Sequence, residues 1–183
     1  MAVITRRLAL AGGTLAAGLS ARKPHAQEPL APLAAVLQPV NPPADMPAIT
    51  FYTADGAPHR LAEFVGHGMV INLWATWCAP CVAEMPSLEA LSKALAPDDI
   101  AVLPLSSDRG GAGAVTRWFG THDITGLPVL LDPKGEAARL LDARGIPTSV
   151  VVDRQGRACA RLEGAADWSD AASVMLVRRL AGG

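Results

Sequence analysis

The chain has 183 residues, 50% of them hydrophobic and 18% charged, with three cysteines and a formal net charge of −1. This length and apolar content predict one domain with a full hydrophobic core and leave too little chain for a second. Residues 1–26 carry four basic and no acidic side chains, so the rest holds 12 basic and 17 acidic ones, a net charge of −5. An acidic body argues against nucleic acid as a partner, and three cysteines are too few for a disulfide-stapled fold.

Residues 1–26 have the order of an export signal. Arg6 and Arg7 precede an apolar run over residues 8–19, and a polar stretch follows. The apolar run is shorter than the roughly 20 residues that a membrane-spanning helix needs. We therefore predict a cleaved signal peptide over residues 1–26 and a periplasmic location, with an N-terminal membrane anchor as the alternative. The arginine pair leaves both twin-arginine and Sec export open.

Residues 27–47 contain six prolines. Proline fixes φ and lacks an N–H donor, so this density opposes regular structure and predicts a linker or extended arm. Beyond it, residues 49–52 and 59–61 flank Asp55-Gly56, a pair that favours a tight turn. These two segments are predicted to form a β-hairpin.

The folded domain is predicted over residues 48–183, with strands and helices in alternation. Residues 69–74 are mostly apolar, as expected of a strand buried on both faces of a sheet. The helix after them carries an apolar stripe at three- and four-residue spacing and contains Pro86, which should kink it. An α/β fold follows, with a central mixed sheet flanked by helices. Further strands are predicted over residues 100–105, 127–131, 148–152 and 158–162, with helices between the first three and one at the end.

Two cysteines stand between that strand and helix, in the run Trp77-Cys78-Ala79-Pro80-Cys81. The first lies at the first turn of the helix, where unpaired N–H groups and the helix dipole favour a thiolate. Cys81 lies one turn further in, on the same face, within bonding distance and with a more buried sulfur. Cys78 is therefore expected to attack a partner's disulfide and Cys81 to resolve the mixed disulfide.

Glu84 follows Cys81 by three residues, so a partly buried carboxylate there could accept the proton that Cys81 loses. The alternative is that Glu84 is a solvated helix residue.

The cysteine pair itself could also be a static bridge or half of a metal site. Two other functions stay open, a metallochaperone holding Cu(I) between both thiolates and a thiol peroxidase of the peroxiredoxin type. Cys159, alone in a predicted strand, is expected to be buried and to pack as a small hydrophobe, with a third redox role as the alternative.

Two segments resemble signatures of the periplasmic thioredoxin-like proteins of the TlpA, ResA and CcmG type. One is residues 72–86, around the cysteine pair, and the other is residues 145–156, which begin Gly-Ile-Pro-Thr. The tail over residues 164–169 is nearest to TlpA. The resemblance covers about residues 48–181 and implies a thioredoxin fold with an N-terminal β-hairpin extension and a central insertion.

The resemblance also implies roles for single residues. Cys78 and Cys81 match the redox pair, and Glu84 matches the family's active-site glutamate. Asn72 takes the place where cytoplasmic thioredoxins have a buried aspartate, which makes Glu84 the better proton acceptor.

Three further positions are expected to meet the partner. Pro147 matches the proline that is cis in thioredoxin folds and packs against the disulfide, with a trans loop proline as the alternative. Ile146, just before it, would offer backbone groups to the partner's extended chain. Trp77 and Pro80 complete the expected substrate-binding residues.

The expected function is that of an exported thiol-disulfide oxidoreductase, favoured in the reductase direction, whose redox-active disulfide Cys78–Cys81 serves in place of a metal or other cofactor. Expected partners are disulfide-bearing exported proteins, among them copper chaperones, oxidase subunits and apocytochrome c, in cytochrome oxidase copper-centre assembly or cytochrome c maturation. A membrane electron donor of the DsbD or CcdA type would recharge a monomeric protein.

Overall fold

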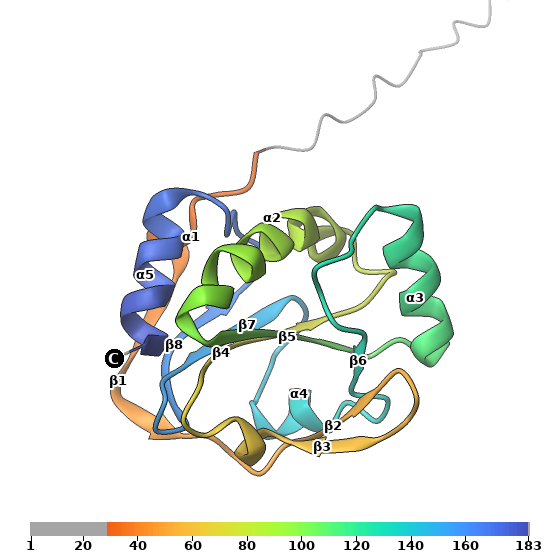
Figure 1. Cartoon of the computed structure of the whole chain (residues 1–183), viewed down its shortest axis with the longest axis horizontal. Coiled ribbons are helices and arrows are strands. Elements are labelled where there is room, and N and C mark those ends of the chain that lie inside the picture. The colour runs from red at the N-terminus through yellow and green to blue at the C-terminus, as the bar shows by residue number, and fades with distance from the viewer. Residues whose placement is uncertain (1–28, 183) are drawn as a thin grey trace, which may run out of the picture.

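A central sheet organises the structure, a computed structural model that describes residues 29–182 (Figure 1). Its eight strands lie in the order β1-β8-β7-β4-β5-β6-β2-β3. Neighbours β4, β5 and β6 run parallel, whereas the remaining pairs are antiparallel, so the sheet is mixed as predicted. The strands are β1 (Gln38–Asp45), β2 (Thr50–Thr53), β3 (Pro58–Arg60), β4 (Gly68–Trp74), β5 (Ile100–Ser106), β6 (Leu130–Leu131), β7 (Thr148–Val152) and β8 (Arg157–Glu163).

Helices cover both faces of the sheet and enclose one apolar cluster on each. Figure 1 shows α1, α2 and α5 above the sheet and α4 below it in this view. Side chains of α3 join the same cluster as those of α2 and α5. The helices are α1 (Leu33–Val36), α2 (Ala79–Leu95), α3 (Gly111–Thr121), α4 (Glu136–Leu140) and α5 (Ala171–Gly182), and two 3-10 turns span Leu61–Phe64 and Ala96–Asp98.

Strand β4 lies at the centre and is buried along its whole length. Successive side chains of a strand point to opposite faces. Accordingly Val70 and Trp74 belong to the cluster under α2, while Ile71 and Leu73 belong to the cluster on the α4 face. The strand therefore ends directly beneath the start of α2, where the cysteine pair lies.

The prediction of a linker or extended arm over residues 27–47 was wrong for residues 33–36 and 38–45, which form regular structure. Residues 33–36 form α1, and β1 pairs antiparallel with β8, with an irregularity between Pro39 and Ala44. The prolines are compatible with a strand here because β1 is the edge of the sheet, where one row of N–H groups needs no partner. Edge position depends on the whole topology, which proline content alone does not reveal.

Most other elements confirm the predictions. Strands β2 and β3 form the expected hairpin, pairing Thr50 with Arg60. Between α3 and β7 the chain adds β6 and α4, where the expected central insertion lies. Helix α2 runs unbroken through Pro86. The strand predicted over residues 127–131 is reduced to β6, since Pro128 has no N–H to donate and only residues 130–131 pair with β5.

The signal peptide predicted over residues 1–26 lies outside the described residues. Within residues 29–182, no helix combines the length and apolarity needed to cross a membrane.

Candidate active site

A disulfide joins Cys78 to Cys81 at the start of α2, with an S–S distance of 2.05 Å and the Cα atoms 5.3 Å apart. Cys78 is the N-cap of the helix, and its Sγ accepts a hydrogen bond from the backbone N–H of Cys81 (3.3 Å). This N–H is among those that a helix leaves unpaired at its N-terminus. A Cys78 thiolate would take the same bond with a full charge, which favours ionisation of this sulfur in the reduced protein.

The two sulfurs differ in access. Cys78 is 6% exposed, whereas Cys81 is fully buried beneath the first turn of α2. The Cys78 Sγ also lies 3.6 Å from the backbone carbonyl oxygen of Ile146. Since nucleophilic exchange needs an accessible sulfur, the geometry supports Cys78 as the attacking residue and Cys81 as the resolving one.

Glu84 is fully buried one turn after Cys81, so the alternative of a solvated helix residue was wrong. Its Oε1 accepts a hydrogen bond from Asn72 Nδ2 (2.9 Å). Its Oε2 accepts from the backbone N–H of Ala166 and from the indole Nε1 of Trp168, both at 3.0 Å. Burial raises the pKa of Glu84 to about 7, against the opposing effect of hydrogen bonds from Trp168, Ala166 and Asn72. The side chain can therefore give or take a proton near neutral pH.

Two of the three donors to Glu84, the Ala166 N–H and the Trp168 indole, come from the tail over residues 164–169, the segment that resembles TlpA. This tail is held in turn by the first described residues of the chain. The N–H of Leu33 donates to the carbonyl of Asp167 (3.1 Å), and the N–H of Asp167 donates to the carbonyl of Ala31 (2.8 Å). Residues 31–33 thus help to keep the tail against α2.

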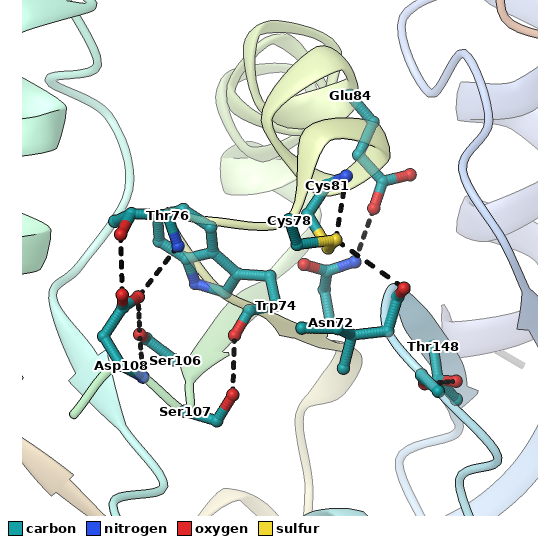
Figure 2. The surroundings of a disulfide bond; sticks show 12 residues. Asn72, Trp74, Thr76, Cys78, Cys81, Glu84, Ser106, Ser107, Asp108 and Thr148 are labelled. Carbon is teal, nitrogen blue, oxygen red and sulfur yellow. Dashed lines mark hydrogen bonds between the residues drawn. A yellow bond between two sulfur atoms is a disulfide. The ribbon is translucent and has the colours of Figure 1, made fainter.

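Sequence reasoning missed Asp108, which fixes the loop before Cys78 (Figure 2). Its carboxylate accepts from the backbone N–H of Thr76 (2.8 Å), from Thr76 Oγ1 (2.6 Å) and from Ser106 Oγ (2.7 Å). The polar run Ser106-Ser107-Asp108 at the end of an apolar strand was a signal that could have indicated it. Asp108 is a positioning residue, because it holds the loop that carries Thr76 and does not contact the sulfur atoms.

The expected partner-binding residues surround Cys78. The Ile146–Pro147 peptide bond is cis, as the resemblance implied, and Ile146 is half-buried. Trp77 is 68% exposed, and Pro80 is exposed in the first turn of α2. The disulfide is therefore bordered by an apolar rim made of Trp77, Pro80 and Ile146.

Cys159 is a free cysteine, unlike the disulfide-bonded pair. It lies on β8 and is partly exposed, with its Sγ 3.6 Å from Asp153 Oδ2. The expectation of a buried cysteine was wrong. Val151 of β7 pairs with Ala160 and Val152 pairs with Ala158, so Cys159 lies at an irregularity of the ladder, without a partner in register. Among residues 29–182, no cluster of three or more His, Cys, Asp or Glu side chains could hold a metal ion.

A mixed sheet flanked by helices, with a cysteine pair opening the helix after a central strand and a cis-proline loop against it, defines a thioredoxin-like protein. Comparison of sequences sharpens this class. The sequence pattern of the AhpC/TSA family matches residues 42–158, and the chain belongs to that family.

Named relatives agree with the class. The chain is 34% identical over 112 residues to the thioredoxin-like protein YneN of Bacillus subtilis (strain 168), covering 60% of this chain and 64% of the relative. It is 29% identical over 110 residues to the thiol-disulfide oxidoreductase ResA of Bacillus thuringiensis subsp. konkukian (strain 97-27), covering 60% and 62%. The matched part therefore spans less than two thirds of either relative. These matches confirm the resemblance to ResA-type proteins.

A solved structure extends the likeness over more of the chain. The thiol:disulfide interchange protein of the thioredoxin family from Chlorobium tepidum TLS superposes with a TM-score of 0.64 at 25% identity, covering 79% of this chain and 99% of that one. The predicted thioredoxin fold is confirmed.

Proposed function

We propose that the protein is an exported thiol-disulfide oxidoreductase that works in the reductive direction through Cys78 and Cys81. The observation that carries the proposal is the cysteine pair at the N-terminus of α2, with its inner sulfur buried one turn before a buried carboxyl group whose pKa is about 7. A static bridge would have no need of a proton acceptor at that place.

The reaction would proceed in two exchanges. The Cys78 thiolate attacks one sulfur of the partner's disulfide, forms a mixed disulfide and expels the partner's other sulfur as a thiolate. The Cys81 thiol then gives up its proton and attacks Cys78 Sγ, which closes the Cys78–Cys81 bridge and expels the partner's remaining thiolate. The partner gains two electrons and takes up protons, and the protein ends oxidised.

Glu84 would accept the proton from Cys81 in the second exchange. An ordinary exposed carboxylate is a weak base at neutral pH, whereas a group with a pKa near 7 is matched to proton transfer there. Because Glu84 can also return this proton, the same group would serve when a donor reduces the bridge again.

The partners in this proposal are disulfide-bearing exported proteins, including copper chaperones, oxidase subunits or apocytochrome c. The oxidised bridge would be recharged by a membrane electron donor of the DsbD or CcdA type. Export rests on the basic and apolar order of residues 1–26. The exposed indole of Trp77 beside Cys78 supports contact with a protein substrate.

Trapping tests the proposal. When it is exported to the periplasm of a bacterial host, the Cys81→Ser protein should accumulate dithiothreitol-sensitive adducts with other proteins. Cys78 can still attack, but no second thiol resolves the mixed disulfide. The matched Cys78→Ser variant should accumulate none. Adducts on Cys78→Ser alone would reverse the two roles. Turnover of hydrogen peroxide by the wild-type protein without reduction of protein disulfides would replace the proposal with the peroxidase alternative, and tight Cu(I) binding without disulfide exchange would favour the metallochaperone.

A further inference from the structure

The side chain of Asn72 has a buried oxygen that the oxidised site does not use. Asn72 is fully buried, and its Nδ2 donates to Glu84 Oε1 and to Ser149 Oγ, both at 2.9 Å. Both hydrogens of the amide are therefore engaged. Its Oδ1 accepts no hydrogen bond from any described residue. A buried acceptor without a donor is costly, so such an atom calls for an explanation.

The position of Asn72 relates this oxygen to the cysteine pair. Asn72 stands between Val70 and Trp74 on the face of β4 that packs under α2. These two neighbours belong to the apolar cluster that contains both cysteines. In the view of Figure 2 the Asn72 carboxamide lies just below the sulfur atoms, with its nitrogen turned towards Glu84 and its oxygen turned away. Because Glu84 follows Cys81 by one helical turn, the amide lies beneath that turn.

Reduction supplies the donor that the oxidised site lacks. In the disulfide neither sulfur has a hydrogen. Two electrons break the S–S bond, and with one proton taken up the products are a Cys78 thiolate at the helix N-terminus and a Cys81 thiol inside. A thiol is a hydrogen-bond donor, although a weak one.

We propose that Asn72 Oδ1 accepts a hydrogen bond from the Cys81 thiol in the reduced protein, so that Asn72 is a positioning residue that stabilises the dithiol state and keeps the proton on Cys81. The inference rests on the proposed function. One neutral amide then links the thiol that must lose a proton to the carboxyl group that receives it. Glu84 is the titratable group bonded to this amide among the described residues.

The redox equilibrium with glutathione tests the proposal, measured in a Cys159→Ser background. Asn72→Leu removes the acceptor Oδ1, and the leucine side chain has no polar atom that could replace it. The equilibrium constant for the reduced form should fall about tenfold, which corresponds to a reduction potential more negative by about 30 mV. The control Ser149→Ala removes a partner of the amide nitrogen and should stay within about twofold of the parent. The same tenfold fall should separate Asn72→Leu/Glu84→Gln from Glu84→Gln, since the lost oxygen acts independently of the carboxylate.

Raman spectroscopy gives a second readout that needs no change at Asn72. In the Cys78→Ser/Cys159→Ser protein, Cys81 is the remaining cysteine, and its S–H stretch should appear at the lower frequency of a hydrogen-bonded thiol. Adding Asn72→Leu should return the band to the free-thiol frequency. A free-thiol band with Asn72 intact, or an unchanged redox equilibrium in Asn72→Leu, would overturn the inference. If the wild-type protein reduces no protein disulfide, the proposed function fails, while both readouts still decide the role of Asn72.

Discussion

Helix α2 carries two buried glutamates, Glu84 and Glu89, whose pKa values are shifted in opposite directions. Burial raises the pKa of Glu84 to about 7, although three neutral groups donate hydrogen bonds to it. Burial also works to raise the pKa of Glu89, but the backbone N–H groups of Thr125 and Gly126, together with the Lys93 ammonium, hold it below its ordinary value. Lys93 Nζ lies 3.0 Å from Glu89 Oε1.

The surroundings of the two glutamates differ in a way that explains why the carboxyl group of Glu84 can exchange a proton near neutral pH and that of Glu89 cannot. Glu89 has a cation beside it and lies at the distal half of α2, where its hydrogen bonds tie the helix to residues 125–126. Within the described residues, Glu84 accepts hydrogen bonds from neutral groups and has no cation as a partner, and it lies one turn from Cys81. A carboxyl group whose anion is disfavoured by burial, with no cation beside it, can give or take a proton near neutral pH.

The largest expected effect separates the two glutamates by kinetics. Glu84→Gln should slow the release of a model partner from its mixed disulfide by about a hundredfold, within the range of general acid–base catalysis. The reduced thiols should also ionise at lower pH, because a neighbouring negative charge is lost. Stopped-flow release and alkylation by iodoacetamide across pH measure these effects. Glu89→Gln should change neither, and equal behaviour of the two variants would remove the catalytic role of Glu84.

The stability of the oxidised protein should show the same contrast across pH. The folded pKa of Glu84, about 7, is above its ordinary value of 4.5, so the native state holds this proton more tightly. The contribution is complete below about pH 4.5 and is lost as pH rises through 7, a decline of about 3 kcal/mol in unfolding free energy. Urea unfolding from pH 4.5 to 8 should show this decline in the wild type and in Glu89→Gln, but not in Glu84→Gln. For Glu89, with its lowered pKa, stability is lost only as pH falls below this window.

A third buried carboxylate, Asp108, extends the comparison from chemistry to position. Asp108→Ala should cost about 2 kcal/mol of unfolding free energy, because the donors of Thr76 and Ser106 lose a buried acceptor. Ser107→Ala, the matched control beside it, should cost less than about 0.5 kcal/mol. Urea denaturation of both variants measures the difference, and similar losses would show that Asp108 does not hold the loop.

The smallest effect concerns the cation that distinguishes Glu89. Lys93→Met should lower the unfolding free energy by less than about 0.5 kcal/mol, since Lys93 is 61% exposed and such helix pairs are weak. Its informative result is electrostatic: the pKa of Glu89, followed by NMR, should rise. An unchanged Glu89 titration would mean that its hydrogen bonds alone oppose the effect of burial.

Sequence reasoning worked where the cause was local. The apolar run of β4, the stripe of α2 and the three-residue step from Cys81 to Glu84 are all readable within a few turns of chain. It failed where partners are remote, since the donors to Glu84 from Ala166 and Trp168 lie 82 and 84 residues away. Burial of Glu84, its shifted pKa and the role of Asp108 all depend on such contacts. The strand β1 was missed for a related reason, because its edge position is a property of the assembled sheet.

The two edges of the sheet have a consequence for self-association. One edge is β1, which contains three prolines, and the other is β3, which has three residues and begins with Pro58. Exposed edge strands recruit other chains into continuous sheets, and proline or short length prevents this. Both edges are therefore poor templates for aggregation, even when many copies are crowded together. Edge-to-edge pairing of sheets between two copies is therefore disfavoured at both ends of the sheet.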